Sequence, residues 1–436
     1  MSYRNSELYR LFNLKDEKAH GRTIMLVTAM LSGAVSWLTG GLFYTSFLTE
    51  NGIDLVKIGI VSSVPFIASC FSVFSPSILE RIEKRRWPLF AARFTYYTLN
   101  ILGVTVMPRL VHDESTKLAL FLIIILAANI INALFSSGYT VWHLNFIPDD
   151  VRAAYFTISS TASSFVGIGT GFVSAIIADS FASSPHAYTI ILVLRYTAYI
   201  LGAFECWLYT RPVEYPYRHL GVKVRLSDII RRPLSSRKFM YTMGIMALWA
   251  FFTNTANASR NYYLLNSIGM KHTYYMLMNF TYTFFQLALM KYTRRVIARF
   301  GWLKTFAVSA LVYSIPIFAC SFVNAANYLW LYTAVRFSQH AAGMFMNTSY
   351  SNVLYINMPE EDRTNYMAFY TLAVNIFSLL GTEAGTLFVG LFPNMNLNFF
   401  GAGLCNVQVL MWIETLGYLI VPALVLMNLK KLSPES

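Results

Sequence analysis

Two short stretches, "IPDDVRAAYF" at 147–156 and "NMPEEDRTNYM" at 357–367, repeat one pattern of a proline, two acids, an arginine and a tyrosine. Matching residues lie 211 positions apart, which is close to half of the 436-residue chain. An offset of this size indicates an internal duplication, with one copy of the phrase in each half. The matched pairs are Tyr139 with Tyr350, Pro148 with Pro359, Asp149 with Glu360, Asp150 with Glu361, Arg152 with Arg363, and Tyr155 with Tyr366.

The composition indicates a protein that resides in a lipid bilayer. Hydrophobic residues make up 56% of the chain, charged residues only 13%, and the mean hydropathy is +0.48. Soluble domains carry about 25% charged residues. Several apolar stretches reach the roughly 20 residues that a membrane-crossing helix needs. They are continuous and lack the alternation of membrane β-strands. We therefore predict an all-α integral membrane protein.

The apolar stretches predict twelve transmembrane helices. They lie near 23–48, 56–79, 88–111, 118–141, 157–181, 189–210, 239–261, 273–290, 303–323, 328–352, 367–391 and 405–428. The only long polar connection is basic and contains "RLSDIIRRPL" (225–234), which predicts a short amphipathic helix at the membrane surface. The expected organisation is an N-terminal segment 1–22, a six-helix half 23–210, a basic hinge 211–238, a second six-helix half 239–428 and a tail 429–436.

The positions of the basic residues predict how the chain is oriented. Most of the 34 Lys and Arg residues fall in segments that lie on one side of the membrane if both termini are cytoplasmic. The net charge of +13 is thus a signal of topology, and a nucleic-acid partner is not needed to explain it. Two halves inserted in the same sense are parallel repeats. We expect a multi-pass protein of the plasma membrane, with the termini and hinge in the cytoplasm.

The loop after the second predicted helix carries a motif seen in a transporter family. It reads "PSILERIEK" (76–84), and it resembles the Gly-x-Leu-x-Asp-Arg-x-Gly-Arg phrase of the major facilitator superfamily. Glu80, Arg81 and Lys84 stand at the charged positions, whereas Pro76 and Glu83 replace the two glycines. The resemblance extends over almost the whole chain in helix number, repeat and hinge, and it leaves the subfamily unresolved.

The corresponding loop of the second half keeps only basic charge. It reads "KYTRRVIARFGW" (291–302). A weaker repeat, 215 positions apart, links the two loops by pairing Ile82 with Ile297 and Trp87 with Trp302.

The resemblance implies a charge relay at a cytoplasmic gate. It assigns this role to Glu80 and Arg81, and the duplicated phrase adds Arg152 and Arg363. Two alternatives stay open. The basic residues also anchor the chain on the inner face, and acids at helix entries stabilise the helix dipole.

Polar residues within the predicted helices are candidates for a substrate site, because charge at the centre of a membrane helix costs about 2.5–3.5 kcal/mol. The resemblance implies that helices 1, 4, 7 and 10 line a central cavity. The candidate substrate-binding residues on three of these helices are Asn129, Asn132, Trp249, Asn254, Asn257, Arg336, His340 and Asn347. Asparagines also join membrane helices by hydrogen bonds, which is the alternative for each of them.

One acid is the candidate for coupling transport to protons. Glu383 lies in "GTEAG" (381–385), where small neighbours permit close helix packing. We assign proton coupling to Glu383 and His340, with Arg336 as the cation expected near Glu383. Arg93 and Arg195 are interpreted as structural or as reaching toward an interface. Glu205 and Glu414 lie closer to helix ends and suit either role.

These features favour a secondary transporter and not an enzyme. The metalloprotease, hydrolase and nucleotide-binding motifs HExxH, GxSxG and GxxxxGK[ST] do not occur. The expected function is proton-linked movement of a small polar or anionic organic solute, with no cofactor or bound metal and with a monomer as the working form. The alternatives are an efflux antiporter for amphipathic compounds and a non-transporting receptor or scaffold.

Overall fold

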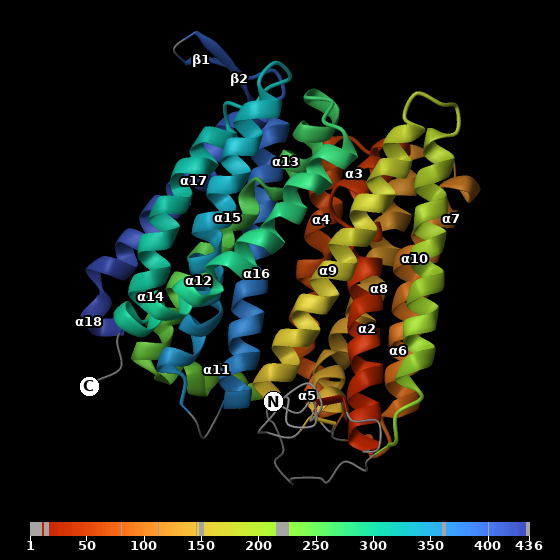
Figure 1. Cartoon of the computed structure of the whole chain (residues 1–436), viewed down its shortest axis with the longest axis vertical. Coiled ribbons are helices and arrows are strands. Elements are labelled where there is room, and N and C mark those ends of the chain that lie inside the picture. The colour runs from red at the N-terminus through yellow and green to blue at the C-terminus, as the bar shows by residue number, and fades with distance from the viewer. Residues whose placement is uncertain are drawn as a thin grey trace, which may run out of the picture. The chain divides into compact units, whose positions relative to one another are not determined.

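The computed structural model describes residues 11–12, 17–79, 81–111, 113–144, 146–147, 152–214, 226–359, 363–399 and 401–432. These residues are almost entirely helical (Figure 1). The contacts between residues divide the chain into two compact units. Unit 1 comprises Met1–Gly52 and Phe71–Val224, and unit 2 comprises Ile53–Cys70 and Arg225–Ser436.

Unit 1 is a bundle built around the first predicted membrane helix. Its helices are α2 (Glu17–Thr39), α3 (Gly41–Glu50), α5 (Ser75–Leu79), α6 (Arg86–Tyr97), α7 (Val104–Leu110), α8 (Glu114–Leu144), α9 (Arg152–Ser180) and α10 (Ala187–Tyr209). Helix α2 packs against α9 and α10, while α6 packs against α8 and α10. A π-helical turn, Thr98–Gly103, joins α6 to α7. Such turns are frequent near functional sites.

The start of α8 is capped by Asp113. Its carboxylate accepts hydrogen bonds from the hydroxyls of Ser115 and Thr116, both at 2.6 Å, and from the Thr116 N–H at 2.8 Å. These hydrogen bonds stabilise the ionised form and lower the pKa of Asp113 to about 2.

Unit 2 contains the remaining helices. They are α4 (Leu55–Ser69), α11 (Leu226–Ser235), α12 (Arg237–Thr255), α13 (Asn257–Tyr262), α14 (His272–Cys320), α15 (Tyr328–Val353), α16 (Arg363–Leu391), α17 (Asn406–Met427) and α18 (Leu429–Leu432). Helix α14 bends at Gly301, whose backbone has φ 76° and ψ 167°, so the predicted helices 273–290 and 303–323 lie on either side of this bend. The helix predicted within the hinge is present as α11.

Helix α4 belongs to unit 2 by its contacts, because it packs against α16. The sequence places it in the N-terminal half 23–210. The two predicted halves are continuous ranges of the sequence, whereas the two units are groups of residues in contact. The units therefore do not test the halves, which stay a prediction.

A short β-hairpin departs from the all-α expectation. Strands β1 (Asn396–Phe399) and β2 (Ala402–Cys405) pair antiparallel, with Asn396 opposite Cys405. The turn contains Gly401 at φ 85°, a conformation that strongly favours glycine. The Phe399 ring lies 5.0 Å from the Trp412 ring, which fastens the hairpin to the start of α17.

Eight helical stretches of the described residues are long and apolar enough to cross a membrane. Many large apolar side chains, such as Ile123, Ile315 and Leu387, are more than half exposed. The pattern suits a lipid environment, where apolar side chains need no burial. The chain is a multi-pass membrane protein, and its full number of twelve crossings stays a prediction.

The tyrosines of the repeated phrase make matching hydrogen bonds. The Tyr155 hydroxyl donates to the Arg22 carbonyl at 3.2 Å in unit 1, and the Tyr366 hydroxyl donates to the Arg232 carbonyl at 3.2 Å in unit 2. Both acceptors lie near the start of a membrane helix, since Arg22 is in the first turns of α2 and Arg232 precedes α12. Tyr155 thus connects the start of α9 to α2, and Tyr366 connects the start of α16 to α11.

Small residues let α16 approach α12 closely, as "GTEAG" predicts. A Cβ atom added to Gly381 would lie 2.1 Å from the carbonyl oxygen of Phe251, and one added to Gly385 would lie 1.9 Å from that of Thr255. Neither glycine can accept a methyl group unless the two backbones separate.

We expect Gly381→Ala to lower the free energy of unfolding by about 1–3 kcal/mol through this overpacking. The matched control is Gly390→Ala in the same helix, where the added Cβ would lie 3.6 Å from Val56, an ordinary contact. The measurement is thermal unfolding of the purified variants in detergent. Equal melting temperatures for the two variants would contradict the close approach of α12 and α16.

Candidate functional site

An ion pair is buried among the helices of unit 1. Arg93 Nη2, from α6, lies 3.2 Å from Glu205 Oε1 on α10. The Glu205 side chain is 1% exposed and that of Arg93 is 17% exposed. Both residues stand in apolar sequence, and the two charges are largely removed from solvent.

Tyrosines enclose this pair. The Tyr97 hydroxyl donates a hydrogen bond to Glu205 Oε2, so both carboxylate oxygens have a partner. The guanidinium carbon of Arg93 lies 4.9 Å from the ring centre of Tyr97 and 5.5 Å from that of Tyr139. The faces of aromatic rings attract a cation. This attraction partly replaces the interaction with water that the buried guanidinium has lost.

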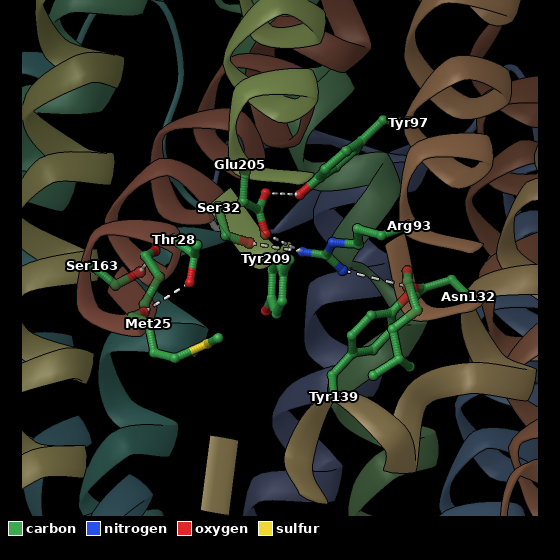
Figure 2. Close-up of polar contacts among 12 residues, drawn as sticks. Met25, Thr28, Ser32, Arg93, Tyr97, Asn132, Tyr139, Ser163, Glu205 and Tyr209 are labelled. Carbon is green, nitrogen blue, oxygen red and sulfur yellow. Dashed lines mark hydrogen bonds and ion pairs between the residues drawn. The ribbon is translucent and has the colours of Figure 1, made fainter. Parts of the chain in front are cut away.

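The same guanidinium contacts two further helices. Arg93 Nη2 donates to Ser32 Oγ on α2 at 3.0 Å, and Nη1 donates to Asn132 Oδ1 on α8 at 3.4 Å. Figure 2 shows Arg93 reaching between Glu205, Ser32 and Asn132. One side chain therefore connects α2, α6, α8 and α10.

A polar pocket of about 330 Å³ lies next to this cluster. It is lined by Ser32, Gly33, Ser36, Trp37, Ser163 and Ser164, from α2 and α9. Gly33 brings these helices together, because a Cβ there would lie 2.5 Å from the Ser163 carbonyl oxygen. Ser32 belongs both to the pocket and to the Arg93 contacts. The pocket thus offers hydroxyl groups and an indole, which suit a polar organic molecule.

Unit 2 contains a second buried ion pair. Arg260 Nη2, from α13, lies 2.9 Å from Glu414 Oε1 on α17. Their side chains are 17% and 2% exposed. Glu414 Oε2 has no hydrogen-bond partner, in contrast to the fully bonded carboxylate of Glu205.

Arg336 on α15 has neutral partners only. Its Nη2 donates to Asn279 Oδ1 at 2.6 Å, and its Nη1 donates to Gln339 Oε1 at 2.8 Å. Its Nε is buried without a partner, and Tyr332 lies 5.9 Å from the guanidinium carbon. Glu383 is half-buried on α16, and no ion pair joins it to Arg336 in the part of the chain that the structure describes. The expected contact between these two residues does not form in this conformation.

The other predicted residues of α15 differ in exposure. His340 is buried, its Nε2 lies 2.8 Å from the Met278 carbonyl oxygen, and the Tyr282 ring lies 5.4 Å away. Asn347 is exposed. Arg336 and His340 therefore lie together within unit 2, both against the first part of α14.

The predicted residues of α12 and α13 also lie in different environments. Asn254 donates to Ser378 Oγ on α16 at 3.2 Å, as a side chain that joins two helices does. Asn257 is exposed at the start of α13. Trp249 is 5% exposed, and its ring lies 4.7 Å from that of Tyr418 and 5.0 Å from that of Phe306. Trp249 thus packs in the aromatic core of unit 2.

The predicted residues of α8 lie near the ion pair of unit 1. Asn132 accepts from Arg93, as described above. Asn129 donates to the Ile125 carbonyl of its own helix at 2.8 Å.

The gate residues are only partly described. Glu80 and the acids at 149–150 and 360–361 lie outside the described residues, and Arg152 and Arg363 are placed only as the first residues of α9 and α16. Arg81 is exposed. The gate assignment therefore stays a prediction.

The sequence left two interpretations open for Arg93 and Arg195, and their buried contacts agree with the structural one. Arg195 does not extend toward an interface, because it is 2% exposed, donates to Thr105 Oγ1 at 2.8 Å and lies 4.1 Å from the Phe47 ring centre. Arg93 forms the ion pair described above. The signal for the pair was present, since Arg93 interrupts the apolar stretch 88–111 well before its end and Glu205 is the only acid in 189–210. The pocket serines carried no such signal, because serine is common in membrane helices.

Within the described residues, no group of three or more His, Cys, Asp or Glu side chains is arranged to hold a metal ion.

Comparison with solved structures identifies the fold. The structure of a mutant form of the nucleoside transporter NupG has a TM-score of 0.70 at 12% identity, covering 93% of this chain and 99% of that one. A bacterial homologue of the iron transporter ferroportin gives 0.66 at 13% identity, covering 95% and 98%. A D-xylose–proton symporter gives 0.63 at 14% identity, covering 95% and 97%. These proteins have the major facilitator fold, and this chain shares it, as the sequence resemblance predicts.

Two comparisons by sequence found no relative. No protein-family model matches the chain, and no curated protein matches it.

We expect Arg93→Gln to lower the free energy of unfolding by about 3–5 kcal/mol, because it leaves the Glu205 carboxylate buried without its cation. The double variant Arg93→Gln/Glu205→Gln should lose less, since no unpaired charge is left. Thermal unfolding in detergent measures both. The control is Arg109→Gln, which removes an exposed cation at the end of α7. A double variant less stable than Arg93→Gln would contradict the pairing.

Proposed function

We propose that this protein is a secondary transporter that moves a small polar or anionic organic solute across the plasma membrane by alternating access, coupled to protons. The fold supports this proposal, because transporters of nucleosides, of xylose with protons and of other solutes share it. Fold does not determine the substrate, so the substrate class is argued from the side chains of this chain.

The observation that carries the proposal is the guanidinium of Arg336. It stands in a helix of a membrane protein with two amide partners and, among the described residues, no carboxylate. An uncompensated cation inside a membrane is costly and marks a ligand or ion path. A guanidinium also matches the geometry of a carboxylate or phosphate group. Arg336 therefore binds the anionic group of the substrate, with His340 beside it.

The serine-lined pocket of unit 1 is a second reason to expect a polar solute. Its hydroxyls donate and accept hydrogen bonds, and Trp37 offers an aromatic face. The remaining proposed binding residues are Asn129, Asn132, Trp249, Asn254, Asn257 and Asn347. Of these, Asn257 and Asn347 are exposed and are better placed to contact a solute than Trp249 and Asn254, which pack between helices.

Proton coupling is assigned to Glu383 and His340. Glu383 is half-buried on α16, and no hydrogen bond or ion pair of the described residues occupies its carboxylate. An acidic side chain within a membrane helix is a candidate for a proton path, which is why we choose Glu383. A second scheme makes Glu383 the resting counter-ion of Arg336 in another conformation.

The proposal includes a topology in which two six-helix halves of a monomer, 23–210 and 239–428, move around the site. Both termini and the hinge 211–238 lie in the cytoplasm, together with the gate residues Glu80, Arg81, Arg152 and Arg363. The matching bonds of Tyr155 and Tyr366 support two equivalent halves.

Reporter fusions test this topology. We expect fusions after Leu48 and near Asn394 to read as external, because the basic segments hold the opposite ends inside. A cytoplasmic signal at either position would rule out the proposed arrangement.

The transport proposal is tested with a ligand that thermal-shift screening of metabolites and drugs identifies, since a ligand of the folded state raises its stability. We expect Arg336→Ala to abolish flux of that ligand in proteoliposomes and to remove its stabilising effect, because the anionic group loses its partner. Arg109→Ala serves as the control for loss of one positive charge. Wild-type flux in Arg336→Ala would refute the role of Arg336. Flux of amphipathic drugs alone would favour the efflux antiporter, and binding without flux would favour a receptor.

The variant Glu383→Gln separates the two schemes for this carboxylate. Proton coupling predicts that uphill accumulation is lost while substrate exchange is retained. The counter-ion scheme predicts altered binding with uphill accumulation preserved. Wild-type accumulation with wild-type affinity would show that Glu383 serves neither.

A further inference from the structure

The middle of α14 presents a basic face. Lys291, Arg294, Arg295 and Arg299 recur at spacings of three and four residues, which places them on one side of the helix. All are exposed, while Thr293 and Ile297 on the opposite side are buried. Like charges at this spacing destabilise a helix, so an interaction outside the helix is needed to offset them.

The cations continue past the bend at Gly301. The Arg299 guanidinium carbon lies 5.3 Å from the centre of the Phe300 ring, and the Lys304 amine lies 5.5 Å from it. Two positive groups thus gather around one exposed aromatic ring. Among the described residues, no acidic side chain forms an ion pair with any cation from Lys291 to Lys304.

In the corresponding loop of the first half, Arg85 and Arg86 are bonded within the protein, whereas Arg81 and Lys84 are exposed. Arg85 donates to the carbonyls of Leu79 at 2.9 Å and of Ile82 at 3.2 Å. Arg86 donates to the Pro212 carbonyl at 2.8 Å, and its N–H binds Glu214 at 2.9 Å. Lys291, Arg294 and Arg295 have no comparable side-chain bonds among the described residues, so these cations are open to an external anion.

The location of the basic face identifies the anion. The segments before Lys291 and after Gly301 are the apolar parts of α14, so the charged turn lies at a membrane face. Tyr292 is 57% exposed and Trp302 is 36% exposed. Exposed aromatic rings beside cations are typical of the level of the lipid headgroups. A soluble anion uses no aromatic side chains there, whereas a phospholipid offers both a phosphate and an acyl boundary.

We propose that the stretch Lys291–Lys304 is a docking surface for anionic phospholipid headgroups. The phosphate binds Arg299 and Lys304, and the helical cations Lys291, Arg294 and Arg295 extend the positive field along the membrane. The aromatic side chains lie at the boundary between the headgroups and the acyl chains. The lipid supplies the negative charge that the described residues do not provide at this turn.

Native mass spectrometry of protein from vesicles of equal phosphatidylcholine and phosphatidylglycerol content tests this surface. We expect wild type to retain phosphatidylglycerol preferentially, and Arg299→Gln/Lys304→Gln to lose about five-fold in that preference for each cation removed. High salt should reduce the preference of wild type, because it screens exposed charges. The control, Arg109→Gln/Lys271→Gln, removes two other exposed cations and should retain the wild-type preference.

Two results would overturn the proposal. One is equal phosphatidylglycerol retention by wild type and Arg299→Gln/Lys304→Gln. The other is complete displacement of the lipid by millimolar inorganic phosphate, which would identify a site for a free anion. Melting temperatures in detergent show whether the variant is folded. If it is unfolded, Lys291→Gln/Arg294→Gln, on the exposed helical face, takes its place with the same expected loss.

Discussion

The need to neutralise guanidinium groups within an apolar protein organises both units. Arg93, Arg195, Arg260 and Arg336 each stand in a helix of a membrane protein, where an unpaired charge is costly. The helices are arranged so that each receives partners. Arg93 alone connects α2, α6, α8 and α10, so the position of these helices depends on one planar group with several donors.

The four arginines are neutralised to different degrees, and this difference underlies the role that we propose for one of them. Arg93 and Arg260 have carboxylate partners. Arg195 has a hydroxyl and an aromatic ring. Arg336 has only amides, which accept hydrogen bonds and carry no negative charge. The carboxylate partners of Arg93 and Arg260 balance their charge, whereas no carboxylate of the described residues pairs with Arg336, and this is why we propose Arg336 as the group that binds an anion. The same reasoning applies at the membrane face. Arg85 and Arg86 of the first half donate hydrogen bonds within the protein, whereas the basic face of α14 has no ion pair among the described residues.

The two halves of the proposed duplication preserve a backbone connection and vary the chemistry around it. Tyr155 and Tyr366 bind equivalent carbonyls at the same distance. A hydroxyl bonded to a backbone carbonyl depends little on neighbouring side chains, so it tolerates divergence elsewhere. The acids on the last long helix of each unit, Glu205 and Glu414, both pair with arginine, but these arginines come from different helices, α6 and α13. Each acid is therefore paired with an arginine, although the helix that supplies the arginine differs.

The sequence by itself determined the membrane class, the helical secondary structure and the fold resemblance. Length and apolarity are local properties, and a bilayer requires each segment to satisfy its own backbone hydrogen bonds. It also identified the lone polar residues, such as Arg336 and His340, and the small residues that bring α16 to α12. Only the tertiary structure decided which of these meet. Arg93 and Glu205 are 112 residues apart, and Arg336 lies against Asn279 and not Glu383, because partners across helices depend on rotation and packing. No local pattern in the sequence encodes those.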